Sequence, residues 1–311
     1  MRVSVVVCTH AMDRYTDCYE AARSVLDQSH DDVELVLVSD GDEAIADRFE
    51  DDFGDRTDVR VHCNDENVGL AVSRNNGAAV ATGDVVAFLD DDAIADREWV
   101  AELVEVYERE DVPAVGGKQV PRWVAGKPSF LPAEFYWLIG VTHLGFGPDG
   151  DPDEPGEVRN TFGSNISFRM DVFEDLGGFE KEIGGRKGDK NLQGEETEFC
   201  ARLKAASGYG VYYNPDAVIA HKIFDYRTDP GWLIDRAFWQ GYSKRGMEVL
   251  VPESTGDESE FLSSLLFDSV PDRLDGIVRS PSVAGVLQLV FLFVLTGAVG
   301  AGYLYGTTVW R

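Results

Sequence analysis

In the first part of the chain, short runs of β-branched residues alternate with stretches that carry an apolar side chain every three or four positions. The short runs predict strands and the periodic stretches predict helices, because side chains repeat every ~2 residues in a strand and every ~3.6 in a helix. Strands and helices are predicted in alternation at 3–8, 15–28, 33–39, 43–53, 59–64, 70–81 and 84–90. This order is typical of an α/β domain whose parallel sheet is covered by helices.

Polar residues stand where three of these predicted strands end. The first strand ends at Thr9, the second at Asp40, and the fourth at the triplet Asp90, Asp91 and Asp92. The carboxyl ends of parallel strands meet at one edge of a sheet, and ligands bind at that edge. The pattern therefore predicts a nucleotide pocket there.

The segment after the first strand, VVVCTHAMDR, contains neither a G-x-G-x-x-G motif nor a P-loop. Without a glycine-rich backbone cradle, the diphosphate of a nucleotide must be neutralised in another way. A divalent cation, Mg²⁺ or Mn²⁺, held by the acidic triplet would do so. A solvated acidic turn is the alternative, but the triplet directly follows the apolar run VVAFL, which places it at the end of a strand.

The C-terminal part of the chain has a different character. No charged residue occurs from Ser282 to Tyr305, and the stretch is long enough to cross a bilayer as a helix. We therefore expect one transmembrane helix over 282–305, with a buried core helix as the alternative. The N-terminus lacks a signal-peptide pattern, so the rest of the chain is expected in the cytoplasm, at the cell membrane. Gly302 and Gly306 form a GxxxG pair that could pack against another helix.

The charge balance excludes some partners. The chain has 56 acidic residues against 28 Lys and Arg, a formal net charge of -28, which argues against nucleic acid as a partner. The carboxylates are spread over the whole chain, and high salt would screen their repulsion, so the composition indicates a halophile. The four cysteines show no paired spacing, as expected of thiols in a reducing compartment.

From about Val3 to His221 the chain resembles inverting family 2 glycosyltransferases of the GT-A fold. The strand VSVVVCTH, the acidic motif VSDGDE and the segment NVGLAVSRNNGAAVATGDVVAFLDDD match the family in order and spacing. The resemblance implies a Rossmann-like nucleotide-diphospho-sugar transferase domain with Asp92 as the first metal ligand. It also implies a nucleotide site, to which we add Thr9 because it lies at the predicted edge of the sheet. The residues of this site are Thr9, Asp40, Asn67, Arg74, Asp90 and Asp91.

The second half of the resemblance supplies the expected chemistry. NTFGSNISFRM resembles the acceptor-side loop and implies that Gly163 and Asn165 approach the donor sugar. GEETEFCARL resembles the motif whose final acid is the catalytic base, here Glu196, where the family has Asp; Glu195 is the alternative base. NPDAVIAHKIF implies that His221 is the second metal ligand. Because a nearby metal ion favours a carboxylate, we expect no raised pKa at the base.

Two segments point to the acceptor. The aromatic, proline-interrupted stretch 121–146 suits a segment that lies against lipid headgroups, with an ordinary hydrophobic layer as the alternative. Lysines are otherwise scarce, yet KEIGGRKGDKN gathers several basic residues, so we expect it to bind an anion, unless it only balances the acidic surface. The candidates for donor or acceptor binding are Arg186, Lys187, Lys190 and, further along the chain, Trp239.

These observations together predict a glycosyltransferase domain over 1–230, divided into a nucleotide half (1–117) and an acceptor half (118–230), a membrane-proximal helical segment (231–281) and the membrane helix. The acidic composition, the anchor and the motifs resemble haloarchaeal enzymes that extend dolichyl-phosphate-linked glycans for N-glycosylation of surface-layer proteins. The resemblance implies transfer of glucuronic acid from UDP-glucuronate to such a lipid. A transferase of a neutral hexose such as glucose, and a catalytically silent sugar-nucleotide-binding scaffold, remain the alternatives.

Overall fold

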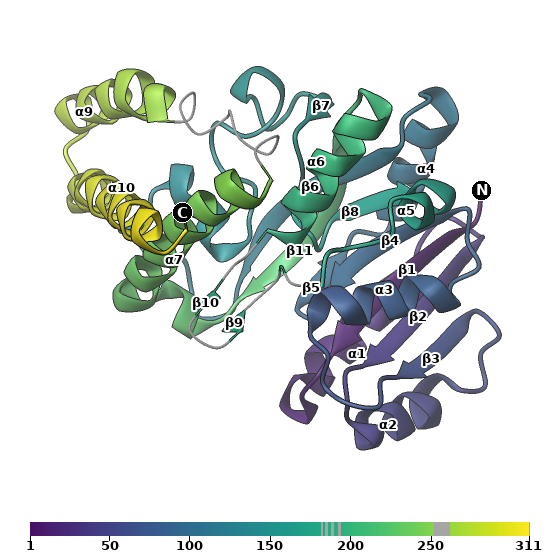
Figure 1. Cartoon of the computed structure of the whole chain (residues 1–311). Helices are drawn as coiled ribbons and strands as arrows, with labels where there is room; N and C mark the ends of the chain where they lie inside the picture. Colours follow the sequence, from purple (N-terminus) through teal and green to yellow (C-terminus); the bar gives the residue numbers. More distant parts are fainter. Residues whose placement is uncertain (182, 184–185, 188–189, 192–193, 252–261, 311) are drawn as a thin grey trace. The chain divides into compact units, whose positions relative to one another are not determined.

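The computed structural model describes residues 1–181, 183, 186–187, 190–191, 194–251 and 262–310. The chain forms two compact units, and Figure 1 labels their helices and strands. The N-terminal unit comprises Met1–Val120, Asp153–Gly185 and Gly194–Lys222, and the C-terminal unit comprises Pro121–Pro152, Arg186–Gln193 and Ile223–Arg311. Each unit thus combines segments that are separate along the chain. The domains predicted from the sequence are continuous, 1–230 divided at 117, and that division stays a proposal.

A mixed sheet is the centre of the N-terminal unit. Its first four strands are parallel and lie in the order β3, β2, β1, β4, with Val3 opposite both Val33 and Val85. Every residue of β1 is buried, which explains its run of valines. The bounds of these strands are β1 (Val3–Thr9), β2 (Val33–Ser39), β3 (Val59–Cys63) and β4 (Val85–Asp90).

Helices cover both faces of this sheet. Val3, Val5 and Val7 of β1 contribute to one core, together with buried residues of α1, α2 and α4, whereas Val6 belongs to a second core with α3. The strand alternation thus divides the apolar side chains between two layers. The α/β prediction is confirmed. The bounds are η1 (Met12–Arg14), α1 (Tyr15–Leu26), α2 (Glu43–Phe53), α3 (Leu70–Val80) and α4 (Trp99–Arg109).

The remaining strands extend the sheet in the order β4, β8, β6, β11, β5, with β7 paired to β11. β8 is antiparallel to both β4 and β6, and β11 is antiparallel to β5 and β7. The bounds are β5 (Ala93–Ala95), β6 (Ala114–Trp123), β7 (Gly156–Val158), β8 (Ile166–Arg169), α5 (Met170–Asp175), α6 (Glu195–Ser207) and β11 (Val211–Ile223).

The aromatic stretch 121–146 forms much of the core of the C-terminal unit. Leu131, Phe135 and Leu138 are buried against apolar residues of α7 and α10. The alternative of a hydrophobic layer therefore describes this stretch better than contact with lipid headgroups. The bounds in this unit are η2 (Ala133–Ile139), η3 (Pro148–Gly150), β9 (Arg186–Lys187), β10 (Lys190–Asn191), η4 (Asp225–Thr228), α7 (Pro230–Leu250), η6 (Leu265–Ser269), α9 (Val270–Arg279) and α10 (Val283–Val309).

Among the described residues, α10 is the one helix long and apolar enough to cross a membrane, as the sequence predicted. Both glycines of its GxxxG pair contact α7 of the same chain, and a Cβ on Gly306 would lie 2.8 Å from Cβ of Arg245. A Cβ on Gly302 would lie 1.8 Å from the carbonyl oxygen of Phe238, and one on Gly241 of α7 would lie 1.9 Å from that of Val299. Small residues allow two helix backbones to approach this closely. The GxxxG pair is therefore used within the chain.

Candidate active site

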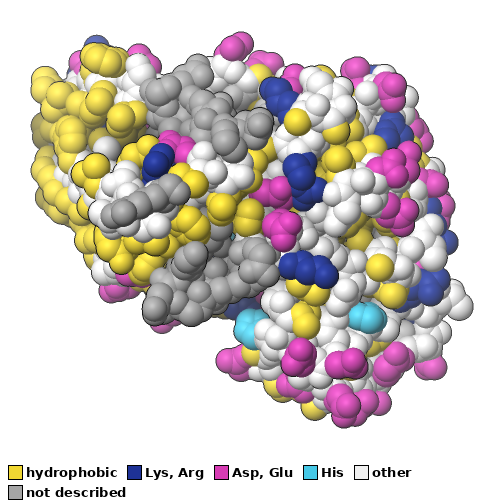
Figure 2. All heavy atoms as spheres, viewed as in Figure 1, with side chains coloured by type: hydrophobic (Ala, Val, Ile, Leu, Met, Phe, Trp, Pro, Cys, Tyr) yellow, Lys and Arg dark blue, Asp and Glu magenta, His cyan; other side chains and the backbone are white. Residues whose placement is uncertain are grey.

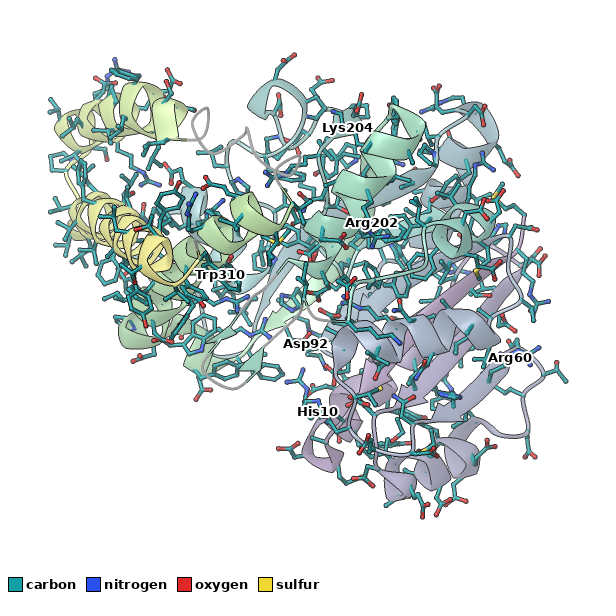
Figure 3. All side chains as sticks on the ribbon, viewed as in Figure 1. His10, Arg60, Asp92, Arg202, Lys204 and Trp310 are labelled. Carbon is teal, nitrogen blue, oxygen red and sulfur yellow. The ribbon has the colours of Figure 1, made fainter. Side chains whose placement is uncertain are left out.

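Three side chains at the edge of the sheet form a cluster that could hold a metal ion. Asp90 ends β4, Asp92 precedes β5 and His221 lies on β11, and one ligand atom from each lies within 4.8 Å of the others. Figure 3 labels Asp92 at this edge. The antiparallel pairing of β11 with β5 places His221 opposite Ala93 and so beside Asp92. His221 Nε2 lies 3.1 Å from Asp92 Oδ1.

The chemistry of this cluster fits a divalent cation. Asp92 and His221 are 2% and 4% exposed, and two carboxylates with one imidazole are ligands that Mn²⁺ accepts, while Mg²⁺ prefers oxygen alone. Buried carboxylates this close together repel one another unless a cation or a proton intervenes. Asp90 thus belongs to the metal cluster, where the acidic triplet had suggested it, whereas the family resemblance placed it in the nucleotide site.

Asp91 is engaged with other side chains of the protein. Its Oδ2 accepts a hydrogen bond from Thr9 Oγ1 at 2.8 Å, and Arg14 binds both of its oxygens, with Nη2 2.6 Å from Oδ1. Nη2 of Arg14 also lies 3.1 Å from Asp92 Oδ2. Burial raises the pKa of the Asp91 carboxyl, and Arg14 opposes that rise. Asp91 and Arg14 therefore orient the neighbouring Asp92.

Arg74 links this edge to the start of α6. It is 3% exposed, and its Nη2 donates to Asp90 Oδ1 at 2.7 Å while its Nη1 lies 3.4 Å from Glu195 Oε1. A Cβ on Gly163 would lie 2.8 Å from the same Nη1, so the loop before β8 passes directly over the guanidinium. The predicted residues Arg74, Asp90, Glu195 and Gly163 are thus neighbours.

The proposed base lies in the first turn of α6. Glu195 and Glu196 follow Gly194, whose φ of 118° is a conformation that side chains other than glycine rarely adopt. Burial, and then the charge of Glu195, raise the pKa of Glu196 to about 7, with Arg74 opposing the rise. We expected no raised pKa beside a bound metal ion; in the metal-free chain the partial burial of Glu196 and the charge of Glu195 raise it. A carboxyl that titrates near neutral pH suits a general base.

Asp40 holds the loop between β3 and α3. Its Oδ1 accepts hydrogen bonds from the Asn64 side chain and the Val68 backbone, both at 2.9 Å, and its Oδ2 accepts one from Gly69 at 3.0 Å. Asn67 is exposed in this loop. A Cβ on Gly41, at a φ of 81°, would lie 2.3 Å from Asn67 N, so the turn after β2 requires glycine. A direct contact of Asp40 with the nucleotide stays a prediction.

The side chain of Asn165 is fully buried and makes three hydrogen bonds within the protein. Its Nδ2 donates to the carbonyl oxygens of Lys118 and Ala217, each at 3.0 Å, and its Oδ1 accepts from Trp99 Nε1 at 2.8 Å. Asn165 therefore joins β6, β11 and α4. We propose that it acts on the donor sugar indirectly, by positioning the loop that contains Gly163.

The other predicted binding residues belong to the C-terminal unit. Arg186 and Lys187 form β9 and Lys190 begins β10, which pair antiparallel, but their side chains lie outside the described residues. Trp239 lies on α7, half-buried, with its ring centroid 5.3 Å from that of Tyr242. Their predicted contacts with donor or acceptor stay proposals.

Arg14 is the principal residue that the sequence reasoning missed. It lies in η1, directly after the strand that ends at Thr9, and its partner Asp91 is 77 positions away. The usable signal was an arginine beside the carboxyl end of a predicted strand, opposite the acidic triplet, in a chain poor in cations. Such a residue is placed to balance part of the negative charge at that edge.

The sequence is similar to those of known glycosyltransferases. Residues 4–177 match the model of Glycosyl transferase family 2. The chain is 51% identical over 307 residues to a glucosyl-dolichyl phosphate glucuronosyltransferase of Haloferax volcanii, covering 98% of this chain and 96% of that protein. It is 30% identical to a pre-mycofactocin glycosyltransferase of Mycobacterium tuberculosis over 71% of this chain and 43% of that protein.

Among solved structures, a mannosyltransferase of Pyrobaculum calidifontis in complex with GDP-Man and Mn²⁺ has the same fold. Its TM-score is 0.61 at 18% identity, covering 98% of this chain and 87% of that one. Residues 1–349 of Staphylococcus aureus TarS, solved in complex with UDP-GlcNAc, give a TM-score of 0.53 at 17% identity, covering 96% of this chain and 82% of that one. The GT-A fold expected from the sequence is confirmed.

Proposed function

Because this chain belongs to glycosyl transferase family 2, we propose that it transfers glucuronic acid from UDP-glucuronate to a dolichyl-phosphate-linked glycan, with glucosyl-dolichyl phosphate as the first acceptor to test. The observation that carries the proposal is the 51% identity, over nearly the full length of both chains, with a glucosyl-dolichyl phosphate glucuronosyltransferase. The product would serve N-glycosylation of surface-layer proteins in a halophile, in keeping with the net charge of -28.

The proposed reaction is a direct displacement. Glu196 accepts the proton of an acceptor hydroxyl while that oxygen forms a bond to the anomeric carbon. The bond from the anomeric carbon to the diphosphate breaks on the opposite side, so UDP leaves and the configuration inverts. Arg74 supports the geometry, since its guanidinium binds Asp90 and reaches Glu195 from one buried position.

Asp90, Asp92 and His221 are the residues that would hold Mg²⁺ or Mn²⁺. Such an ion, when bound, neutralises charge on the leaving diphosphate. Arg14 and His221 approach different oxygens of Asp92, which keeps that carboxylate in one orientation. Thr9 contributes by holding Asp91 beside them.

We assign the attachment to the cell membrane to α10, as a single span with the N-terminal unit in the cytoplasm. This helix has 27 residues and a mean hydropathy of 2.2, and only 11% of its most apolar window is buried in the structure. A core helix of a soluble protein would be mostly covered. The exposure of α10 therefore supports contact with lipid.

The test is transfer of radiolabelled sugar by the full chain in high salt with Mn²⁺ or Mg²⁺. UDP-glucuronate and UDP-glucose are compared as donors, with glucosyl-dolichyl phosphate as acceptor. We expect labelled lipid from UDP-glucuronate, its loss in Glu196→Gln, and its retention in Glu108→Gln, an equivalent change at an exposed position on α4.

Three results would each overturn part of the proposal. Label from UDP-glucose alone would replace glucuronic acid by a neutral hexose. Binding of UDP without transfer from either donor to any lipid acceptor would favour a catalytically silent scaffold. Full activity of Glu196→Gln would refute the assignment of the base while leaving the reaction intact.

A further inference from the structure

The helical segment before α10 exposes a row of apolar side chains. Phe267, Leu274 and Val278 are 76%, 49% and 79% exposed. Positions 267, 271, 274 and 278, all exposed, follow the helical spacing of one face through η6 and α9. We call this row the α9 stripe. A polar row with the same spacing borders it, made of Asp268, Asp272, Asp275 and Arg279. The segment is therefore amphipathic along its whole length.

A different side of α9 is attached to the rest of the C-terminal unit. Arg273 donates from Nε to Glu134 Oε1 at 2.7 Å and from Nη1 to Gln288 Oε1 at 2.8 Å. Gln288 of α10 in turn donates to the carbonyl oxygen of Ser129 at 3.1 Å. Glu134 is 2% exposed, so this ion pair is largely removed from water and holds α9 in one orientation.

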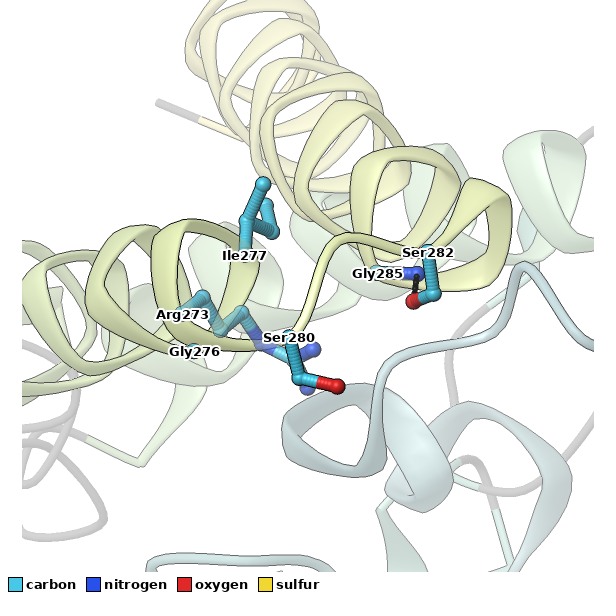
Figure 4. Close-up of a pocket in the computed structure, with 6 residues that line it drawn as sticks. All are labelled: Arg273, Gly276, Ile277, Ser280, Ser282 and Gly285. Atoms are coloured by element: carbon cyan, nitrogen blue, oxygen red, sulfur yellow. Dashed lines mark hydrogen bonds between the residues drawn. The ribbon is translucent and has the colours of Figure 1, made fainter.

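Figure 4 shows which side of α9 faces α10. Arg273, Gly276 and Ile277 line a hollow whose other side is formed by the link and the first turn of α10, with Ser282 capping that turn. None of these three α9 residues belongs to the α9 stripe. The stripe consequently points away from the contact with α10.

The exposed apolar surface continues from α9 onto α10. Val283, Val290 and Phe293 are 78%, 49% and 50% exposed. Figure 2 shows hydrophobic side chains gathered over α9 and α10 on the same face of the molecule. Contiguous exposed apolar surface of this kind marks a site of contact with a membrane or another protein.

We propose that the α9 stripe is a second membrane-contacting element, in which α9 lies parallel to the bilayer surface with the stripe at the boundary between headgroups and acyl chains. The occupant is lipid, because the stripe is continuous with the exposed face of an α10 long and apolar enough to span. An amphipathic helix with acidic residues beside the apolar row can keep its charges in the headgroup water. The inference rests on the proposed membrane attachment.

Contact of the α9 stripe with lipid would fix the rotation of the C-terminal unit about the axis of α10. A single spanning helix can turn about its axis, whereas α9, held by Arg273 to both Glu134 and Gln288, adds a second point of contact. Two membrane contacts at different places on one compact unit restrict that rotation. The C-terminal unit would thus present one side to the lipid, as an enzyme acting on a lipid-linked acceptor requires.

The experiment places an environment-sensitive fluorophore on single cysteines in the full chain. Cys8, Cys18 and Cys200 are buried and burial raises their pKa, so Cys63→Ser leaves a background of low reactivity. The labelled variants are Val278→Cys on the stripe, Asp275→Cys on the polar row of the same helix and Phe293→Cys on α10, in vesicles of diether phosphatidylglycerol in molar KCl.

We expect blue-shifted emission, quenched by lipid-borne nitroxide, at positions 278 and 293, and emission as in water at position 275. If the label at 293 is in lipid while 278 and 275 both report water, this inference is refuted and the anchoring by α10 stands. If the label at 293 also reports water, the membrane attachment itself fails. A label at 275 that is quenched as strongly as the one at 278 would place α9 inside the bilayer and contradict the interfacial position.

Discussion

If Glu196 is the base, transfer should be lost as the pH falls through the pKa of its carboxyl, which burial and then the charge of Glu195 raise to about 7. A carboxyl of this pKa is about one-tenth ionised at about pH 6, so kcat/KM should fall roughly tenfold for each pH unit below that value. Glu195→Gln removes the neighbouring negative charge, which lowers the pKa of Glu196 and moves the acid limb to lower pH.

The assay is the initial rate of sugar transfer between about pH 5 and about pH 8.5 at constant ionic strength and saturating divalent cation. A folded far-ultraviolet spectrum at each pH controls for acid unfolding. Glu108→Gln, on the exposed side of α4, controls for loss of one carboxylate elsewhere. A bound cation near Asp90 acts against the effect of Glu195, so an acid limb somewhat below 7 still agrees with the reasoning.

The same carboxyl makes a prediction about stability in metal-free protein. Its pKa in the folded chain lies above the unfolded value of about 4.3, so the folded state holds the extra proton between the two values. The free energy of unfolding should therefore decrease as the pH rises through that interval. The stability of Glu196→Gln relative to the wild type should rise over the same interval and reach its full value above about pH 7. In the activity assay, a kcat/KM that stays constant over the whole pH range would refute the assignment of Glu196 as the base. An acid limb that Glu195→Gln moves to higher pH would refute it as well.

Two further changes test the packing around the site and the anchor. Asn165→Ala leaves Trp99 Nε1 and two carbonyl oxygens without their buried partner. The free energy of unfolding should therefore fall by about 3 kcal/mol in a denaturant titration. An effect no larger than that of Asn67→Ala, at an exposed position, would contradict this prediction. Gly302→Leu forces a side chain against the Phe238 carbonyl and should lower the midpoint of thermal unfolding in detergent. Gly300→Leu should not lower it, because no atom lies within 4 Å of a Cβ at that position. Equal shifts of the midpoint would argue against the α7–α10 contact.

The parts of the site that lie at predicted strand ends could be found from the sequence. Asp90 and Asp92 follow an apolar run, so local pattern alone placed them at the ligand edge of a parallel sheet. His221 could not be placed in this way, because it reaches Asp92 through the pairing of β11 with β5, 129 positions along the chain. Only the family resemblance pointed to it.

Burial by distant segments explains the other differences. The aromatic stretch 121–146 has the composition of an interfacial segment, but residues of α7 and α10, later in the chain, cover Phe135 and Leu138. Local pattern does not say what will cover an apolar face. The α9 stripe is the converse case, since its amphipathic spacing is visible in the sequence while its exposure at Phe267 and Val278 appears only in the fold.

The hydrogen bonds of Asp40 bear on the thermodynamics of nucleotide binding. Because its carboxylate already binds Asn64, Val68 and Gly69, the free protein holds the loop that carries Asn67 in one conformation. Binding then loses little conformational entropy in this loop. Asp40→Ala would release the loop as well as remove a carboxylate, so its weaker binding should appear in calorimetry mainly as a more unfavourable entropy.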